Sequence, residues 1–126
     1  MYSILIIEDE LDLSEAIESA LNEFGYEVKI VGTSAAGLES VREHKPDLIF
    51  LDMMTGSLHG VEFLKKLREL PKGLNDSKVI VLTNLDNNIT KDQTIDYKVS
   101  DYIVKTNSSI DEIVTKAQKV LAEWGG

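Results

Sequence analysis

The chain has 126 residues, 43% of them hydrophobic, which suits one folded domain with a substantial core. Asp and Glu number 22 against 13 Lys and Arg, and the net charge of −9 argues against direct binding to nucleic acid or to an anionic membrane surface. The absence of cysteine excludes disulfides, thiol catalysis and thiolate metal sites. No apolar run is long enough to cross a bilayer or to act as a secretion signal, so we expect a cytoplasmic protein.

The first part of the chain predicts two strands, each followed by a helix. Residues 3–7 are a compact apolar run, typical of a strand buried on both faces. The next helix ends at Gly25, where a left-handed cap is expected. Residues 27–31 alternate as in a strand near a sheet edge, and Thr33 or Ser34 can cap the second helix. The residues expected to face inward are Leu13, Ile17, Ala20, Leu21 and Phe24 in the first helix, and Ala35, Leu38 and Val41 in the second.

The middle of the chain predicts a third strand and a third helix. Four consecutive apolar residues, 48–51, stand between Asp47 and Asp52, which again indicates a strand buried on both faces. After a loop through Gly60, a helix with Val61, Leu64 and Leu67 on its inner face follows, and residues 71–73 break it.

The last part of the chain predicts two more strands and a long final helix. Residues 78–82 form a strand that ends at Thr83, and residues 101–104 form one that ends at Lys105. Between them the sequence is polar and weakly periodic, and we predict a helix over roughly 88–97. Ser109 and Glu112 form a capping box for the final helix, whose inner face carries Ile110, Ile113, Val114, Ala117, Val120, Leu121 and Trp124.

Strands and helices therefore alternate strictly, without repeats or linkers. Such alternation predicts an α/β fold with a five-stranded parallel sheet and helices on both faces. The flavodoxin-like, doubly wound strand order 2-1-3-4-5 fits this pattern and places the topological switch point between the first and third strands. We expect one domain over residues 1–124, with 125–126 as a tail or a linker remnant.

Chemically active side chains follow the predicted strands at their carboxyl ends. Glu8 and Asp9 follow the first strand, Asp52 ends the third, Thr83 ends the fourth and Lys105 follows the fifth. In the order 2-1-3-4-5 the three acids converge, and their mutual repulsion is relieved by a hard cation such as Mg²⁺. An acid cluster with Mg²⁺, a lysine and a hydroxyl suits a phosphoryl group, with Asp52 as the carboxylate that would form an aspartyl phosphate.

Each of these residues has an ordinary explanation when it is taken alone. Asp52 can be a capping or turn aspartate, and Glu8 and Asp9 can simply favour the positive end of the first helix. Thr83 can merely end a strand, and Lys105 can be a solvated charge before a turn. The prediction of a site rests on all five falling at one edge of one sheet.

Four stretches of this sequence and one glycine resemble the receiver domain of two-component response regulators. Residues 4–10 resemble the opening strand and acidic pair of that family, and residues 48–54 its phosphorylation strand. Gly60 falls where the family has a glycine eight residues past the aspartate. Residues 79–83 resemble its hydroxyl strand and residues 101–105 its lysine strand. The resemblance covers essentially the whole chain.

The resemblance implies a phospho-acceptor that is not an enzyme, apart from catalysing its own phosphorylation and dephosphorylation. Asp52 would take phosphate from a histidine kinase or a phosphotransfer protein. Asp9 and Asp52, with the backbone carbonyl of Met54, would hold Mg²⁺, and Glu8 would act largely through water. Thr83 and Lys105 would contact the phosphoryl oxygens.

The resemblance also implies a conformational switch. Tyr102 would be the switch aromatic and would turn inward when Thr83 moves toward the phosphate. The output surface would combine the predicted helix at 88–97, the strand at 101–104 and the final helix, and would act on an unknown output protein or a fused effector domain. Its oligomeric state would be a monomer or a weak dimer.

Four departures from the family pattern surround the predicted switch. Gly56 and Thr106 stand where the family usually has proline, and the Lys105–Thr106 bond is expected to be trans, because a non-proline cis bond costs about 3 kcal/mol. Asn84 replaces a small residue beside Thr83, where it could alter access to the phosphoryl group. Residues 98–100 replace the usual glycine-alanine, so the preceding helix is expected to end differently.

Other functions on this fold fit the sequence less well. A degenerate receiver that acts only as a non-phosphorylated binding module would have lost an acid or the lysine, and none is lost. A flavin site would need a Ser/Thr-rich loop after the first strand, and here that loop is acidic. A haloacid-dehalogenase-type phosphatase would need an acid at Met54, and a P-loop enzyme would need a Gly-Lys-Ser/Thr loop.

Overall fold

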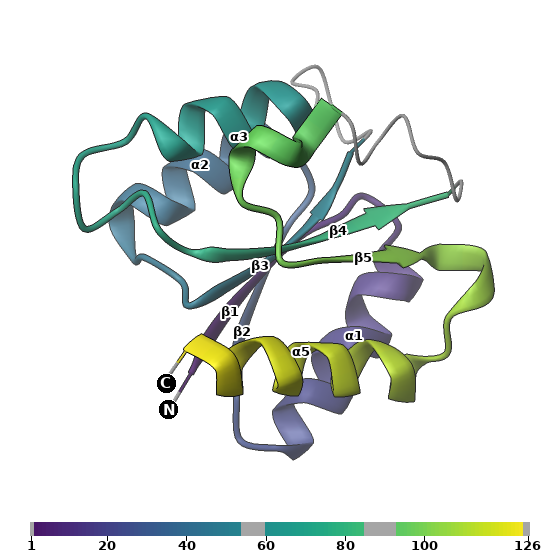
Figure 1. The fold of residues 1–126 in the computed structure, drawn as a ribbon. Coiled ribbons are helices and arrows are strands. Elements are labelled where there is room, and N and C mark those ends of the chain that lie inside the picture. Colours follow the sequence, from purple (N-terminus) through teal and green to yellow (C-terminus); the bar gives the residue numbers. More distant parts are fainter. Residues whose placement is uncertain (1, 54–59, 85–92, 125–126) are drawn as a thin grey trace.

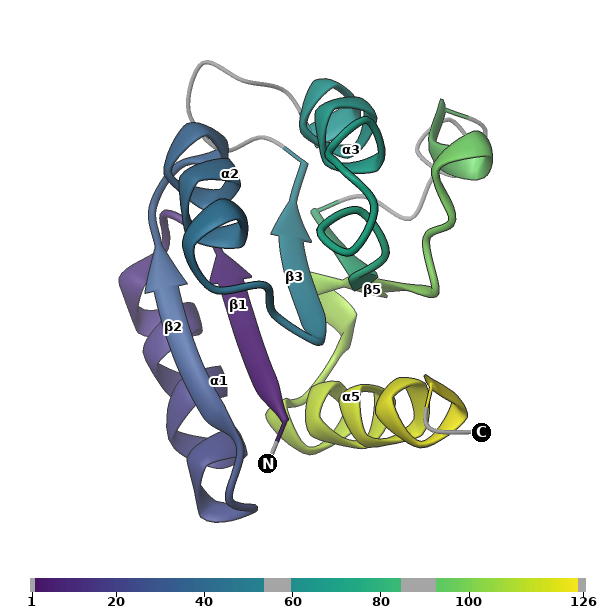
Figure 2. The same cartoon turned by 90° about the vertical axis from the view of Figure 1, so that its left-hand side faces the viewer.

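The computed structural model describes residues 2–53, 60–84 and 93–124. Within them a five-stranded parallel sheet has the order β2-β1-β3-β4-β5, which confirms the predicted topology. Figure 2 shows the arrowheads of β1, β2 and β3 pointing toward one edge of this sheet. The strands are β1 (Ser3–Ile7), β2 (Glu27–Val31), β3 (Leu48–Asp52), β4 (Lys78–Thr83) and β5 (Asp101–Val104).

Helices cover both faces of the sheet (Figure 1). One face carries α1 and α5, and the other carries α2, α3 and the short helix η1, which lies beside α3. The helices are α1 (Leu11–Glu23), α2 (Ser34–Glu43), α3 (Gly60–Arg68), η1 (Ile95–Tyr97), η2 (Lys105–Asn107) and α5 (Ile110–Trp124). In the described part of the chain, no helix has the length and apolar character needed to cross a membrane.

The central strand β3 is buried at every position, as its apolar run predicts. Because successive side chains of a strand point to opposite faces, β1, β3 and β4 each contribute to two cores. Ile6, Phe50 and Ile80 belong to the core under α1 and α5, whereas Ile7 and Leu51 belong to the core under α2 and α3. By contrast, β2 alternates between exposed and half-buried residues, as expected of an edge strand.

The predicted helix boundaries are largely confirmed by their caps. The Thr33 hydroxyl accepts a hydrogen bond from the backbone N–H of Ala36 at 3.1 Å. Gly25 has a φ of 86°, in the left-handed region expected after a helix. The Ser109 hydroxyl accepts from the Glu112 N–H at 3.1 Å, and the Glu112 carboxylate faces the Ser109 N–H at 3.5 Å, which completes the capping box.

Among the side chains that the structure describes, which exclude that of Trp124, two that are predicted to face inward are exposed. The inner face of α2 is formed by Ser34, Gly37, Leu38 and Val41, which leaves Ala35 on the outside. Phe24 is 59% exposed, because α1 ends at Glu23 and Phe24 already belongs to the turn. The prediction for Ala35 is wrong because helical spacing is compatible with neighbouring faces, and only the packing partner decides between them.

The segment before β5 is described in part. Residues 88–92 of the helix predicted over 88–97 lie outside the described residues, and residues 93–97 form a helical turn that ends as η1. Lys98 follows with a φ of 58° in the left-handed region, so this turn ends on a lysine rather than on a glycine. The Lys105–Thr106 bond is trans, as expected, and the described residues contain no cis peptide bond.

Candidate functional site

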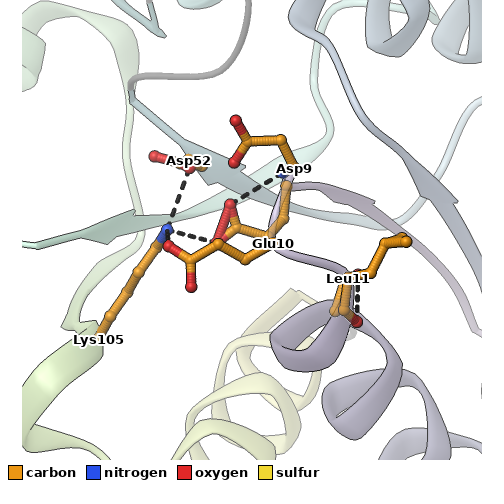
Figure 3. A network of polar contacts seen from close by, with 7 residues as sticks. Asp9, Glu10, Leu11, Asp52 and Lys105 are labelled. Atoms are coloured by element: carbon orange, nitrogen blue, oxygen red, sulfur yellow. Dashed lines mark hydrogen bonds and ion pairs between the residues drawn. The ribbon is translucent and has the colours of Figure 1, made fainter.

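Three carboxylates gather where β1 and β3 end. Glu8 and Asp9 follow β1, and Asp52 ends the neighbouring strand β3, whose Leu51 is in register with Ile7. Carboxylate oxygens of the three residues lie within 4.8 Å of one another. Figure 3 shows Asp52 and Glu10 beside the amino group of Lys105, while the carboxylate of Asp9 points away from it. The structure thus brings together the acids that the sequence places at one edge of the sheet.

Lys105 reaches into this cluster from the end of β5. Its ammonium donates to Asp52 Oδ2 at 3.1 Å and forms an ion pair with Glu8 Oε1. The side chains of Glu8, Asp52 and Lys105 are 0%, 8% and 6% exposed. These charges therefore interact with little screening by water, unlike an ordinary surface ion pair.

Glu10 is a further member of the cluster that the sequence analysis did not identify as part of the site. Its Oε1 lies 3.5 Å from the Lys105 ammonium, although the Glu10 side chain is 58% exposed. Glu10 directly follows the two predicted metal ligands, and that proximity was the only signal available from the sequence. Lys105 consequently faces three acids rather than two.

The close approach of these charged groups shifts the pKa values of Glu8 and Lys105. Burial and the hydrogen bond to Asp52 raise the pKa of Glu8 from 4.5 to about 8, although Lys105 acts in the opposite direction. Burial alone would lower the pKa of the Lys105 ammonium, but its contacts with Glu8 and Asp52 raise it above the ordinary value. The site therefore favours positive charge and disfavours a further negative charge.

The residues present fit a hard divalent cation. Glu8 Oε1 is buried and, among the described residues, has no hydrogen-bond partner besides the ion pair with Lys105. Three acidic side chains each place a carboxylate oxygen within 4.8 Å of the others. Carboxylate oxygens are the ligands that Mg²⁺ prefers. The predicted fourth ligand, the carbonyl of Met54, lies outside the described residues, as does Gly56.

Thr83 stands at the same edge of the sheet on the next strand. It is the last residue of β4 and is half-buried. The preceding residue, Leu82, is in register with Asp52, and Thr83 itself is in register with Val104, the neighbour of Lys105. The backbone thus places Thr83 at the end of β4 and Lys105 directly after the end of the adjacent strand β5. Asn84 follows as an exposed residue.

Gly60 has a steric role next to the acid cluster. Its N–H donates to the carbonyl of Met53 at 3.0 Å, and Met53 directly follows Asp52. A Cβ at position 60 would lie only 2.8 Å from the Met53 Cα, a distance that side chains do not tolerate. Only glycine therefore lets α3 begin this close to the end of β3.

Tyr102, the predicted switch aromatic, is half-buried on β5. Its side chain packs on the α2 and α3 face of the sheet, together with Tyr97 and Val99. Its hydroxyl shares a hydrogen bond with the hydroxyl of Thr94. Thr94 was not identified from the sequence, because it lies in the polar stretch where periodicity is weak.

Arg68 is a half-buried cation that the sequence analysis did not single out. Its guanidinium donates to the carbonyls of Tyr97 at 2.8 Å, Asn75 at 3.0 Å, Ser77 at 2.8 Å and Lys98 at 3.1 Å. The end of α3 is thereby tied to the loop before β4 and to the end of η1. Because all four partners are backbone atoms, the pattern of side chains in the sequence does not predict this contact.

The comparisons with known proteins agree with this geometry. A family model described as response regulator receiver domain matches residues 4–118. Response regulator ArlR of Staphylococcus aureus is 32% identical over 121 residues, a match that covers 96% of this chain and 53% of the relative. The chain thus spans about half the length of the curated relatives it matches.

Solved structures share the fold. A response regulator receiver domain protein from Methanospirillum hungatei JF-1 aligns with a TM-score of 0.87 and 24% identity, over 98% of this chain and 95% of that one. A two-component response regulator from Clostridium difficile aligns with a TM-score of 0.89 and 19% identity, over the whole length of both chains. At these identities the likeness establishes the flavodoxin-like architecture alone.

Proposed function

The chain belongs to the response regulator receiver domain family, and we propose that it is a phospho-acceptor switch whose acceptor is Asp52. The observation that carries the proposal is the buried cluster in which the Lys105 ammonium lies 3.1 Å from Asp52 Oδ2 with Glu8 on its other side. Asp52 is the one acid of this cluster that stands on the central strand. A carboxylate in this position can attack a phosphoryl group that approaches from the open edge of the sheet.

In the proposed reaction an oxygen of Asp52 forms a bond to phosphorus while the bond between phosphorus and a nitrogen of the donor histidine breaks. The histidine keeps the electron pair of that bond and leaves as a neutral imidazole after proton transfer. Charge shifts onto the oxygens of the transferred group, where Lys105 and the hydroxyl of Thr83 would stabilise it. A small phosphodonor such as acetyl phosphate would react by the same displacement.

Glu8, Asp9 and Asp52, with the carbonyl of Met54, would hold Mg²⁺, Glu8 acting largely through water. When bound, this ion would supply positive charge that offsets the repulsion between the acids and the incoming phosphoryl oxygens. Proximity of the three carboxylates, within 4.8 Å of one another, supports this assignment. The chain itself would contribute the fixed positions of these ligands through β1 and β3.

A histidine kinase or phosphotransfer protein would be the donor in the cytoplasm. The chain spans about half of its curated relatives, so the phosphorylated state would be read either by a fused effector domain or by a separate output protein. The surface of η1, β5 and α5 would carry the signal, with Tyr102 as the switch aromatic. A monomer or a weak dimer without direct contact to nucleic acid or membrane suits this role.

The experiment is intact-mass measurement after incubation with acetyl phosphate, with and without Mg²⁺. The wild type should gain the mass of one phosphoryl group in the presence of Mg²⁺, and Asp52→Asn should not. Asp12→Asn removes an exposed acid of α1 and is the matched control, which should react like the wild type. A wild type that gains no phosphoryl group while still binding Mg²⁺ would contradict the proposal and favour a binding-only receiver.

A further inference from the structure

Thr94 is a buried polar residue that the proposed chemistry does not use. Its side chain is 0% exposed, and its hydroxyl forms a hydrogen bond with the hydroxyl of Tyr102, eight residues later in the chain. The two residues come from different elements, since Thr94 precedes η1 and Tyr102 lies on β5. The contact therefore joins the η1 turn to the edge strand of the sheet.

The turn that carries Thr94 is fixed at its other end. Arg68 donates to the carbonyls of Tyr97 and Lys98, the residues that close η1. Lys98 adopts a left-handed conformation that is unfavourable for a residue with a side chain, and these two hydrogen bonds help to hold it. Figure 1 shows this short helix lying against α3. Thr94 is thus presented to Tyr102 from a supported turn.

A hydroxyl that is fully buried favours the conformation in which it keeps its hydrogen-bond partner. Loss of such a partner inside a protein costs free energy that corresponds to roughly a tenfold change in an equilibrium constant. Tyr102 can keep the bond to Thr94 only while its side chain stays on the α2 and α3 face, where it packs beside Tyr97 and Val99. The bond and the apolar packing therefore act in the same direction.

We propose that Thr94 is a positioning residue for Tyr102, which it holds on the α2 and α3 face of the sheet before any phosphoryl group reaches Asp52. The importance of Thr94 for signalling rests on the proposed function. The hydrogen bond between Thr94 and Tyr102 does not depend on that function. The hydrogen bond sets the resting position of the switch aromatic. A movement of the Tyr102 side chain away from the α2 and α3 face must break the hydrogen bond to Thr94. A state in which the side chain stays on that face is favoured by the same bond.

The test is NMR spectroscopy of the unphosphorylated protein with labelled tyrosine. Thr94→Val keeps the shape of the side chain and removes the hydroxyl, whereas Thr94→Ser keeps the hydroxyl. In Thr94→Val we expect the Tyr102 hydroxyl proton to exchange roughly tenfold faster and the ring resonances of Tyr102 to shift, while Tyr97 stays unchanged. Thr94→Ser should restore the wild-type exchange, and Thr115→Val, at an exposed threonine of α5, should have no effect.

A reciprocal measurement keeps the proposal testable if Thr94→Val folds poorly. Tyr102→Phe removes the other hydroxyl, and the unfolding equilibrium constants of the two single variants and the double variant should be non-additive by roughly two- to tenfold. Additive effects, or Tyr102 resonances in Thr94→Val that match the wild type, would overturn the proposal. Failure of acetyl phosphate to modify Asp52 would refute the phospho-acceptor function instead, because these measurements involve no phosphate.

Discussion

Two cations, the buried Lys105 ammonium and the half-buried Arg68 guanidinium, show two ways in which this fold accommodates positive charge. Lys105 lies among the acids Glu8, Glu10 and Asp52 at the carboxyl edge of the sheet. Arg68 lies among four backbone carbonyls between α3, the loop before β4 and η1. A cation removed from water needs hydrogen bonds or opposite charge in either case. The two surroundings differ in net charge, because one consists of acids and the other of neutral carbonyls.

The surroundings of Arg68 are complete, whereas those of Lys105 are not. Neutral carbonyls satisfy the guanidinium without adding charge, and they hold one loop and one turn in place. At the other site the negative charges outnumber the single ammonium, and burial keeps the pKa of Glu8 near 8. A cation whose donors are held by neutral backbone carbonyls indicates a structural role, and an excess of acids around one lysine indicates a site that takes up further positive charge. The following predictions test this contrast.

The largest effect is expected at Arg68. Arg68→Met removes the charge and leaves four carbonyls without their donor, so we expect the free energy of unfolding to fall by about 3 kcal/mol. Urea denaturation measures this change. Arg42→Met is the matched control, since Arg42 is exposed and, in the described part of the chain, forms an ion pair only with Glu39 on its own helix. It should change stability by less than about 0.5 kcal/mol. Equal effects of the two variants would contradict a structural role of Arg68.

The pH dependence of stability should report on Glu8 when Mg²⁺ is removed with EDTA. Folded Glu8 keeps its proton up to about pH 8, whereas in the unfolded chain it loses the proton near 4.5. Its contribution to stability is therefore fully present below pH 4.5 and is lost as the pH rises toward 8.

We expect this loss to amount to about 2 kcal/mol. One proton at about 1.4 kcal/mol per pH unit would give at most about 5 kcal/mol over the interval from 4.5 to about 8. Glu8→Gln cannot titrate and should show a flatter profile over the same range. If wild type and variant have the same pH profile of urea denaturation, the pKa of Glu8 is not raised in the folded protein.

A smaller effect is expected from the steric contact at the edge of the acid cluster. Gly60→Ala places a methyl group against the backbone of Met53 and should destabilise the protein by about 1.5 kcal/mol through overpacking. Gly32→Ala is the control, because a Cβ at position 32 meets nothing within 4 Å, and its effect should stay below about 0.5 kcal/mol. Thermal unfolding distinguishes the two; a harmless Gly60→Ala would mean that α3 does not fix the end of β3.

Much of this fold can be predicted from the sequence because the strands are short apolar runs with strict alternation of helices between them. The acids and Lys105 could also be placed, since parallel strands deliver their carboxyl ends to one edge. Apolar periodicity in α2 left the face undecided, and Ala35 was assigned to the wrong side. Phe24 was assigned to the inner face of α1 because its spacing is helical, but α1 ends at Glu23 and Phe24 belongs to the following turn.

The contacts of Arg68 and Thr94 could not be predicted. Arg68 binds carbonyls that lie between 7 and 30 residues away in sequence. Backbone acceptors occur at every position, so they leave no mark in the side-chain pattern. The bond between Thr94 and Tyr102 depends on where the η1 turn settles against β5, and this follows from tertiary packing rather than from local propensity.

The most direct test of the contrast between the two cations is the response of thermal stability to Mg²⁺. At a Mg²⁺ concentration tenfold above the dissociation constant, the wild type should gain about 1.4 kcal/mol, a rise in Tm of roughly 5 °C. Arg68→Met should show the same gain from a lower starting point. Asp9→Asn should lose it, while Asp12→Asn, at an exposed acid, should keep it. An equal rise in Asp9→Asn, or no rise in the wild type, would contradict the account of the acid cluster as a site that takes up positive charge.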